Sequence, residues 1–164
     1  QSNDINPSNL FYGNEVISRN NKIVVTSNRH TYILDSENGS IILKKNFTSI
    51  IKPLIVDKYV FFITKNNLLI SLNIDDGELL YSYNINKKIS DFLKTKQKKV
   101  SFKMLMLSNG KLLVFLKNSY VLTFSLKGEL EKIIKLPSKI KSNPIFINNS
   151  IAYLDQKNKI SLVD

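Results

Sequence analysis

The chain has 164 residues, of which 43% are hydrophobic and 23% are charged, with no Cys, no Trp and a single His. This composition excludes a disordered chain, a disulfide scaffold, a zinc site with thiolate ligands and a cysteine nucleophile. The formal net charge is +11, but 22 Lys accompany only two Arg, together with 20 Asn and 21 Ile. Since nucleic-acid readers depend on Arg, and AT-rich codons raise Lys, Asn and Ile together, we interpret most of the charge as codon bias and expect no nucleic-acid partner.

Residues 1–14 are predicted to be an N-terminal extension or a strand donor. The segment starts at Gln1 without Met and without a basic and then apolar signal segment, so we expect a processed or shortened N-terminus. The longest apolar runs have about five to six residues, whereas a bilayer-spanning helix needs about 18 or more.

Four stretches of the chain share one pattern, at about residues 15–47, 50–85, 100–136 and 142–164. Each has three short apolar or β-branched runs separated by two polar breaks, which indicates strand, tight turn, strand, hairpin loop and strand. The first break carries residues that tolerate a positive φ, namely Asn20-Asn21, Asp57-Lys58, Asn109-Gly110 and Asn148-Asn149. In the first three repeats a glycine turn (Gly39, Gly77, Gly128) leads into a fourth strand.

We align Leu34, Leu72, Phe124 and Leu162 as equivalent positions, which lie 38, 52 and 38 residues apart. A period near 40 with four strands per repeat is typical of propeller blades. The sequence therefore predicts an all-β fold, a β-propeller with about four blades, each a four-stranded antiparallel sheet. The longer middle interval contains a basic insertion at residues 86–99 with six Lys, in which a short helical turn is expected.

The second repeat reads Leu72-Asn73-x-x-Asp76-Gly77-x-x-x-Tyr81 after Pro53 and an apolar strand, and the first repeat carries Leu34-Asp35-x-x-Asn38-Gly39. This pattern resembles the PQQ-type propeller repeat, over about residues 15–164. Within that superfamily the chain is most similar to the BamB family of outer-membrane assembly lipoproteins. The resemblance implies a non-catalytic scaffold for protein–protein interaction in the periplasm, attached to the outer membrane through an N-terminal lipid anchor that this chain lacks. Its partners would be outer-membrane assembly components or unfolded polypeptide.

The chain departs from the family pattern at the Trp that docks neighbouring blades, which is replaced by Leu43, Tyr81 and Lys132. It also lacks the cysteines and the acidic cluster of PQQ enzymes, so the resemblance implies a fold without a cofactor, and we expect no enzymatic activity. Two alternatives stay open. One is a fragment of a PQQ-dependent quinoprotein dehydrogenase, and the other is an ectodomain that senses a ligand or a protein.

Propellers of this superfamily resemble rings of seven or eight blades, whereas about four repeats are present here, and the last one stops where a turn and an outer strand are due. We therefore expect a fragment or half of a larger ring, with a second copy covering the open blade edges. The alternative is a small closed ring in which residues 8–12 supply the missing outer strand.

Two groups of residues are candidates for protein binding, and no residue is predicted to be catalytic or to bind a metal or a cofactor. By symmetry the second hairpin loops of the four repeats should gather at one mouth of the ring. The basic insertion interleaves apolar and Lys positions, which favours docking of a partner or an anionic surface. The loop candidates are Arg29, His30, Lys65, Asn66, Lys117, Asn118, Lys157 and Asn158, and the insertion candidates are Ile89, Phe92, Leu93, Lys94 and Lys96.

Overall fold

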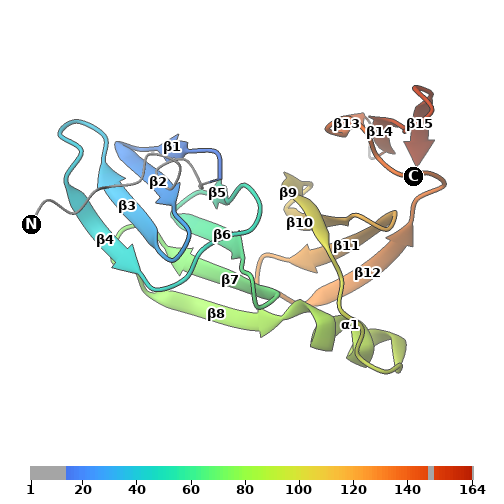
Figure 1. Cartoon of the computed structure of the whole chain (residues 1–164), viewed down its shortest axis with the longest axis horizontal. Coiled ribbons are helices and arrows are strands. Elements are labelled where there is room, and N and C mark those ends of the chain that lie inside the picture. The colour runs from blue at the N-terminus through green and yellow to red at the C-terminus, as the bar shows by residue number, and fades with distance from the viewer. Residues whose placement is uncertain (1–13, 148–149, 164) are drawn as a thin grey trace, which may run out of the picture. The chain divides into compact units, whose positions relative to one another are not determined.

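The computed structural model describes residues 14–147 and 150–163, in which antiparallel sheets dominate (Figure 1). The chain divides into two compact units, Gln1–Asn84 and Ile85–Asp164, here called unit 1 and unit 2. Among the described residues, no helix is long and apolar enough to cross a membrane.

Unit 1 holds two four-stranded sheets in which every strand pairs with the next one along the chain. Their apolar faces form one core, in which Val24 and Ile33 of the first sheet pack with Phe62 of the second. Phe47 meets Phe62 edge to face, with ring centroids 5.2 Å apart. The strands are β1 (Ile17–Arg19), β2 (Lys22–Thr26), β3 (Thr31–Asp35), β4 (Ile41–Lys45), β5 (Leu54–Val56), β6 (Tyr59–Ile63), β7 (Leu68–Asn73) and β8 (Leu79–Asn84).

Unit 2 opens with a helix and continues with one four-stranded and one three-stranded sheet. The two sheets share a second core, in which Phe115 and Val121 pack with Ile151 and Tyr153. The elements are α1 (Ile85–Leu93), β9 (Phe102–Ser108), β10 (Lys111–Leu116), β11 (Tyr120–Ser125), β12 (Leu130–Lys135), β13 (Ile145–Ile147), β14 (Ser150–Leu154) and β15 (Ile160–Val163).

The turn residues adopt the conformations that their chemistry predicts. Asn20 and Asn21 have φ of 48° and 57°, and Asn109 and Gly110 have φ of 48° and 69°. Two successive residues with positive φ match the twist of a two-residue hairpin, so this prediction is confirmed in both places. The corresponding pair Asn148-Asn149 lies outside the described residues.

The four-strand repeat is confirmed by a shared turn before β4, β8 and β12. Gly39, Gly77 and Gly128 have φ of 73°, 74° and 79°. In the first turn the Asp35 carboxylate accepts hydrogen bonds from the backbone N–H of Glu37 at 2.8 Å and of Asn38 at 3.2 Å. In the second turn Asn73 takes the place of Asp35 and accepts from the backbone N–H of Asp75 at 3.0 Å, while Asp76 accepts from that of Glu78 at 2.7 Å. The acidic cluster around Asp76 is therefore a turn, as its place in the repeat predicts.

One predicted equivalence is wrong by one residue. Leu72 pairs with Val60 in the ladder of β6 and β7, and the matching pair in β14 and β15 is Ile151 with Val163. Val163, rather than Leu162, is thus the fourth member of the series. The dipeptide Ser-Leu occurs in both strands, but it is shifted by one place relative to the hairpin, and a shift of one residue moves a side chain to the other face.

The insertion also differs from its predicted form. The expected short helical turn is a helix of nine residues that begins at Ile85, directly after β8 ends at Asn84. Ile85, which the sequence assigns to the preceding strand, is fully buried at the start of α1. The proposed strand donor, residues 8–12, lies outside the described residues, and closure of a ring stays a prediction.

Candidate functional site

In unit 1 the second hairpin loops of the two sheets lie next to each other. Arg29, Lys65 and Asn66 line one hollow of about 310 Å³, together with Asn28 and Thr48. The Lys65 ammonium donates a hydrogen bond to the backbone carbonyl of Asn28 at 3.3 Å. The structure therefore brings three of the predicted loop residues together around a hollow that Phe47, Leu68 and Ile70 also line.

These two loops are shaped by short polar side chains at the strand ends. The Ser27 hydroxyl accepts a hydrogen bond from the backbone N–H of His30 at 3.1 Å, and the Thr64 hydroxyl accepts from that of Leu68 at 3.2 Å. The imidazole of His30 lies 5.9 Å from the ring of Tyr32. Within residues 14–147 and 150–163, no three His, Cys, Asp or Glu side chains are grouped to hold a metal ion.

In unit 2 the corresponding loop between β14 and β15 is held by Asp155. Its carboxylate accepts hydrogen bonds from the backbone N–H of Lys157 at 2.8 Å and of Lys159 at 2.9 Å. These bonds, above all the one from Lys159, hold the pKa of Asp155 below its usual range. The side-chain oxygen of Asn158 accepts a hydrogen bond from the Lys141 ammonium at 2.6 Å.

The remaining loop candidates, Lys117 and Asn118, lie between β10 and β11. The backbone N–H of Lys117 donates to the carbonyl of Ser101 at 2.9 Å, and Asn118 lines a different cavity, described next. The structure thus groups Arg29, Lys65 and Asn66 in unit 1, and a single mouth shared by all four loops stays a prediction.

The basic insertion borders a cavity of about 410 Å³ in unit 2. Of its five candidates, Ile89, Leu93 and Lys96 line this cavity, whereas Phe92 and Lys94 do not. The lining also contains residues that sequence reasoning missed, namely Lys98, Lys99, Val100, Leu116, Tyr120, Leu122 and Ile133. The apolar members from β11 and β12 carry no signal in the sequence, because they look like any other strand residues.

The loop after α1 is held at both ends. Lys94 has a φ of 51°, and the backbone N–H of Thr95 donates to the carbonyl of Ser90 at 3.0 Å, which closes the helix with a left-handed residue. At the other end the backbone N–H of Val100 donates to the buried Asn86 amide oxygen at 3.3 Å. Lys94 therefore serves as a helix cap, and the loop between Thr95 and Val100 carries the lysines of the cavity.

Two of the three positions at which PQQ-type repeats carry a Trp make an apolar contact here. Leu43 packs against the core of unit 1. Tyr81 stacks on Tyr83 with ring centroids 5.0 Å apart, and burial raises the pKa of the Tyr81 hydroxyl far above its usual value.

Comparisons with known proteins support the fold. No family model matches the chain, and no curated protein sequence matches it. Among solved structures, it is similar to BamB from Moraxella catarrhalis, with a TM-score of 0.70 and 12% identity over 91% of this chain and 42% of that one. The computationally designed Ika4 protein has a TM-score of 0.63 and 13% identity over 90% of this chain and 87% of that one.

An enzyme is also among the similar structures. A quinohemoprotein alcohol dehydrogenase from Pseudomonas putida has a TM-score of 0.57 and 14% identity over 78% of this chain and 22% of that one. The chain therefore spans less than half the length of BamB and less than a quarter of the dehydrogenase. At this level of identity the likeness concerns the fold alone, and the chain has a β-propeller fold similar to part of BamB.

Proposed function

We propose that the chain is a non-catalytic propeller scaffold that binds other polypeptides in the periplasm during outer-membrane protein assembly. The observation that carries this proposal is the three-stranded sheet β13–β15, in which the described residues leave apolar side chains of one face exposed and give β15 a strand partner on one edge alone. The similarity in fold to BamB supports the assignment to this process and place.

The open face of this sheet is apolar. Ile145 and Leu162 flank Ala152 across the three strands, and both are largely exposed. Ile160 is 82% exposed, whereas its counterpart in the β6–β7 hairpin, Leu69, is fully buried. The position that is exposed in β13–β15 is thus buried in the equivalent hairpin. We therefore expect another polypeptide to cover the exposed apolar face of β13–β15. We propose a second copy of the chain as that cover.

The open edge belongs to β15. The equivalent strands β3, β7 and β11 each pair with a fourth strand, but β15 pairs only with β14 among the described residues. The N–H and C=O groups on its other edge meet no strand of residues 14–147 and 150–163, and such groups are a template for an added strand. An extended segment of an unfolded outer-membrane β-barrel polypeptide suits this edge, because its backbone supplies the missing hydrogen bonds.

A titration tests the proposal. A fluorescent, urea-unfolded outer-membrane β-barrel polypeptide is diluted into the protein, and its anisotropy is followed with the wild type, Ile160→Lys and the control Leu79→Lys on an exposed strand of unit 1. We expect saturable binding to the wild type. Ile160→Lys should weaken this binding, and Leu79→Lys should leave it unchanged. Absence of binding contradicts the scaffold, and an absorbing complex with PQQ and Ca²⁺ favours the quinoprotein alternative.

A further inference from the structure

The cavity beside α1 has an apolar interior. Leu122 and Ile133 lie opposite each other on β11 and β12 and form its floor. Ile89 and Leu93, one helical turn apart on α1, form a wall. The volume of about 410 Å³ falls near the lower end of the range of ligand pockets, about 300–1,000 Å³, and suits one bulky apolar group.

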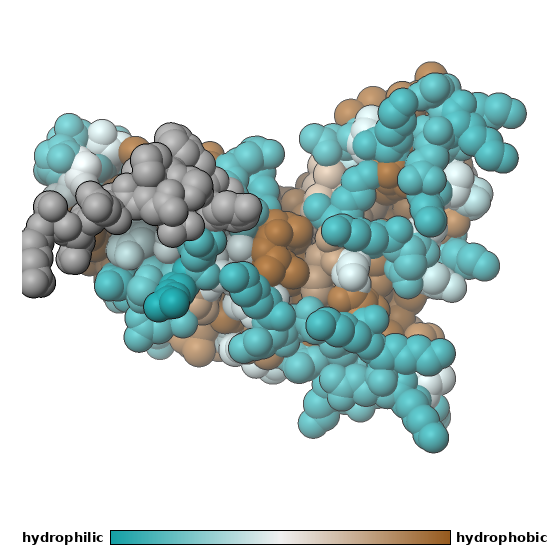
Figure 2. Space-filling model, viewed as in Figure 1, coloured by the Kyte–Doolittle hydropathy of each residue, from teal (hydrophilic) through white to brown (hydrophobic). Residues whose placement is uncertain are grey.

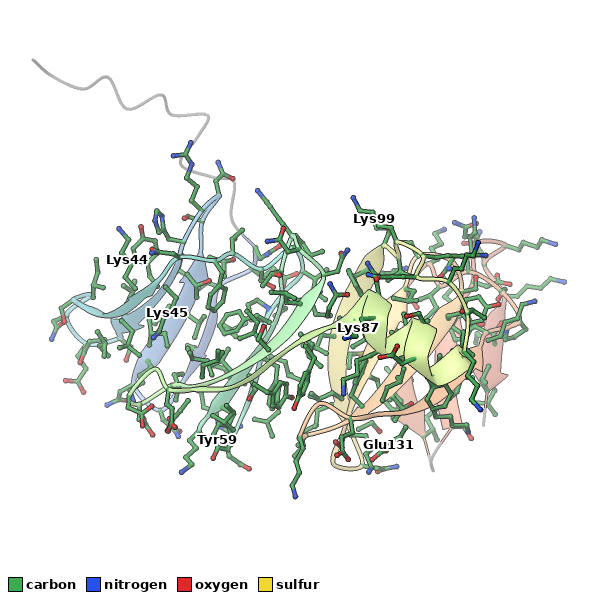
Figure 3. All side chains as sticks on the ribbon, turned by 90° about the horizontal axis from the view of Figure 1, so that it is seen from below. Lys44, Lys45, Tyr59, Lys87, Lys99 and Glu131 are labelled. Atoms are coloured by element: carbon green, nitrogen blue, oxygen red, sulfur yellow. The ribbon has the colours of Figure 1, made fainter. Side chains whose placement is uncertain are left out.

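The mouth of this cavity is strongly basic. Lys96, Lys98 and Lys99 line it, and none of the ion pairs found in the described part of the chain includes any of the three. Asp91 is the only acidic residue between positions 85 and 101. In Figure 2 the lobe of α1 and its loop, at the lower right, is covered by hydrophilic residues, and Figure 3 labels Lys87 on α1 and Lys99 on the loop. Three lysine ammonium groups on one cavity favour the binding of an anion.

The loop that carries these lysines is held in place at both ends by contacts within the protein. The cap at Lys94, the bond from Val100 to Asn86 and the bond from Lys117 to Ser101 fix its ends. A preformed rim reduces the ordering cost of binding.

The direction of the helix favours a peptide over a membrane surface. A helix that lies on a lipid bilayer turns its apolar stripe outward. Here Ile85 is fully buried and Ile89 lines the cavity, so the first half of the apolar stripe faces the protein, while Phe92 and Leu93 at its end are about half exposed. Asn118 and Tyr120 add polar groups to the lining, which suits the backbone of a peptide.

We propose that this cavity binds an acidic peptide segment, with one bulky apolar side chain held between α1 and β11–β12 and flanking carboxylates on Lys96, Lys98 and Lys99. The inference rests on the proposed function, since it names a second kind of polypeptide that the scaffold takes. The site is separate from the β13–β15 sheet, so the two fail independently.

The test uses a fluorescein-labelled peptide Glu-Asp-Phe-Glu-Asp and anisotropy at low and at physiological salt. The charge-reversal pair Lys96→Glu with Lys99→Glu is compared with Lys127→Glu and Lys139→Glu, two exposed lysines of unit 2 that do not line the cavity. We expect the first pair to weaken binding about tenfold or more at low salt, and the second to weaken it no more than about twofold.

A second comparison tests the apolar interior on one helix. Leu93 is 49% exposed and lines the cavity, whereas Phe92 is 46% exposed and does not. Leu93→Ser should weaken the peptide at least about fivefold and Phe92→Ser should not, since only Leu93 loses contact with the inserted side chain.

Three outcomes overturn the inference. The first is that a cavity variant and its control weaken the peptide equally, either in the comparison of lysine charge reversals or in that of Leu93→Ser with Phe92→Ser. The second is that a peptide with Ala in place of Phe binds equally well. The third is that the protein binds anionic lipid vesicles and does not bind the peptide. If the unfolded β-barrel polypeptide still binds the protein while the acidic peptide does not, the scaffold proposal stands and this inference alone fails.

Discussion

Substitution of Gly77 measures how closely the two sheets of unit 1 pack. Gly77 and Gly39 occupy the same turn with φ of 74° and 73°. A Cβ added to Gly77 would lie 3.0 Å from Cδ1 of Leu43 and 3.1 Å from Cε of Lys45, both on β4 of the other sheet. A Cβ added to Gly39 would meet nothing within 4 Å. Gly39→Ala is therefore a matched control for Gly77→Ala.

The expected magnitudes follow from these contacts. An L residue in the left-handed region costs about 1–2 kcal/mol, and both variants incur this cost. Gly77→Ala adds a close contact with the ends of the Leu43 and Lys45 side chains, which can shift by a few tenths of an ångström, so the added cost lies at the low end of overpacking, about 1 kcal/mol. We expect the free energy of unfolding to fall by about 1–2 kcal/mol for Gly39→Ala and by about 2–3 kcal/mol for Gly77→Ala.

Urea unfolding at 25 °C, followed by far-UV circular dichroism, measures both variants with the same denaturant slope. Leu43→Ala costs stability by itself, because Leu43 packs against the core, but it also removes the close methyl group. The loss in the combined variant Leu43→Ala with Gly77→Ala should therefore be smaller than the sum of the two single losses. Equal losses for Gly77→Ala and Gly39→Ala, or additive losses in the combined variant, would refute the described contact between the sheets.

Three further predictions address the core, the last hairpin and the open face. Phe62→Ala should lower the free energy of unfolding by about 3–5 kcal/mol in urea, and Phe92→Ala by under about 0.5 kcal/mol, because Phe62 is fully buried and Phe92 is 46% exposed. The backbone hydrogen bonds that lower the pKa of the Asp155 carboxyl stabilise the fold while this carboxyl is ionised. This contribution is complete above about pH 4, the pKa of the carboxyl in the unfolded chain, and is lost as the pH falls through its pKa in the folded protein. Asp155→Asn should therefore shift the urea midpoint at pH 7 more than at pH 3, and equal shifts would contradict the hydrogen bonds of its carboxylate. Light scattering should give the wild type a mass of at least twice 18.8 kDa, while Ile160→Lys approaches 18.8 kDa and Leu79→Lys does not. A monomeric wild type would exclude the second copy as the cover of β13–β15.

Much of the fold can be predicted from local turn chemistry. Asn20-Asn21 and Asn109-Gly110 mark hairpins because few residues adopt a positive φ, and Gly39, Gly77 and Gly128 mark the start of each fourth strand. The register of the last strand is harder to predict, because β15 contains apolar residues at both faces. Its hydrophobic pattern therefore does not distinguish Leu162 from Val163.

The candidate sites are only partly visible in the sequence. The repeat predicts that Arg29 and Lys65 are neighbours, and they line one hollow. The cavity beside α1 is not predictable in the same way, since Leu93 and Ile133 are 40 positions apart and meet only through tertiary packing. The Lys-rich composition of the insertion indicates an anionic partner, but which lysines face the cavity depends on the cap at Lys94.

Amide hydrogen exchange at β15 tests the central claim most directly. The protein is incubated with and without the urea-unfolded outer-membrane β-barrel polypeptide, and exchange of the Ile160–Val163 amides is compared with that of β11, which is paired on both edges. An added strand should slow exchange in β15 and leave β11 unchanged. Unchanged exchange in β15 at a polypeptide concentration that saturates binding would contradict strand addition at this edge.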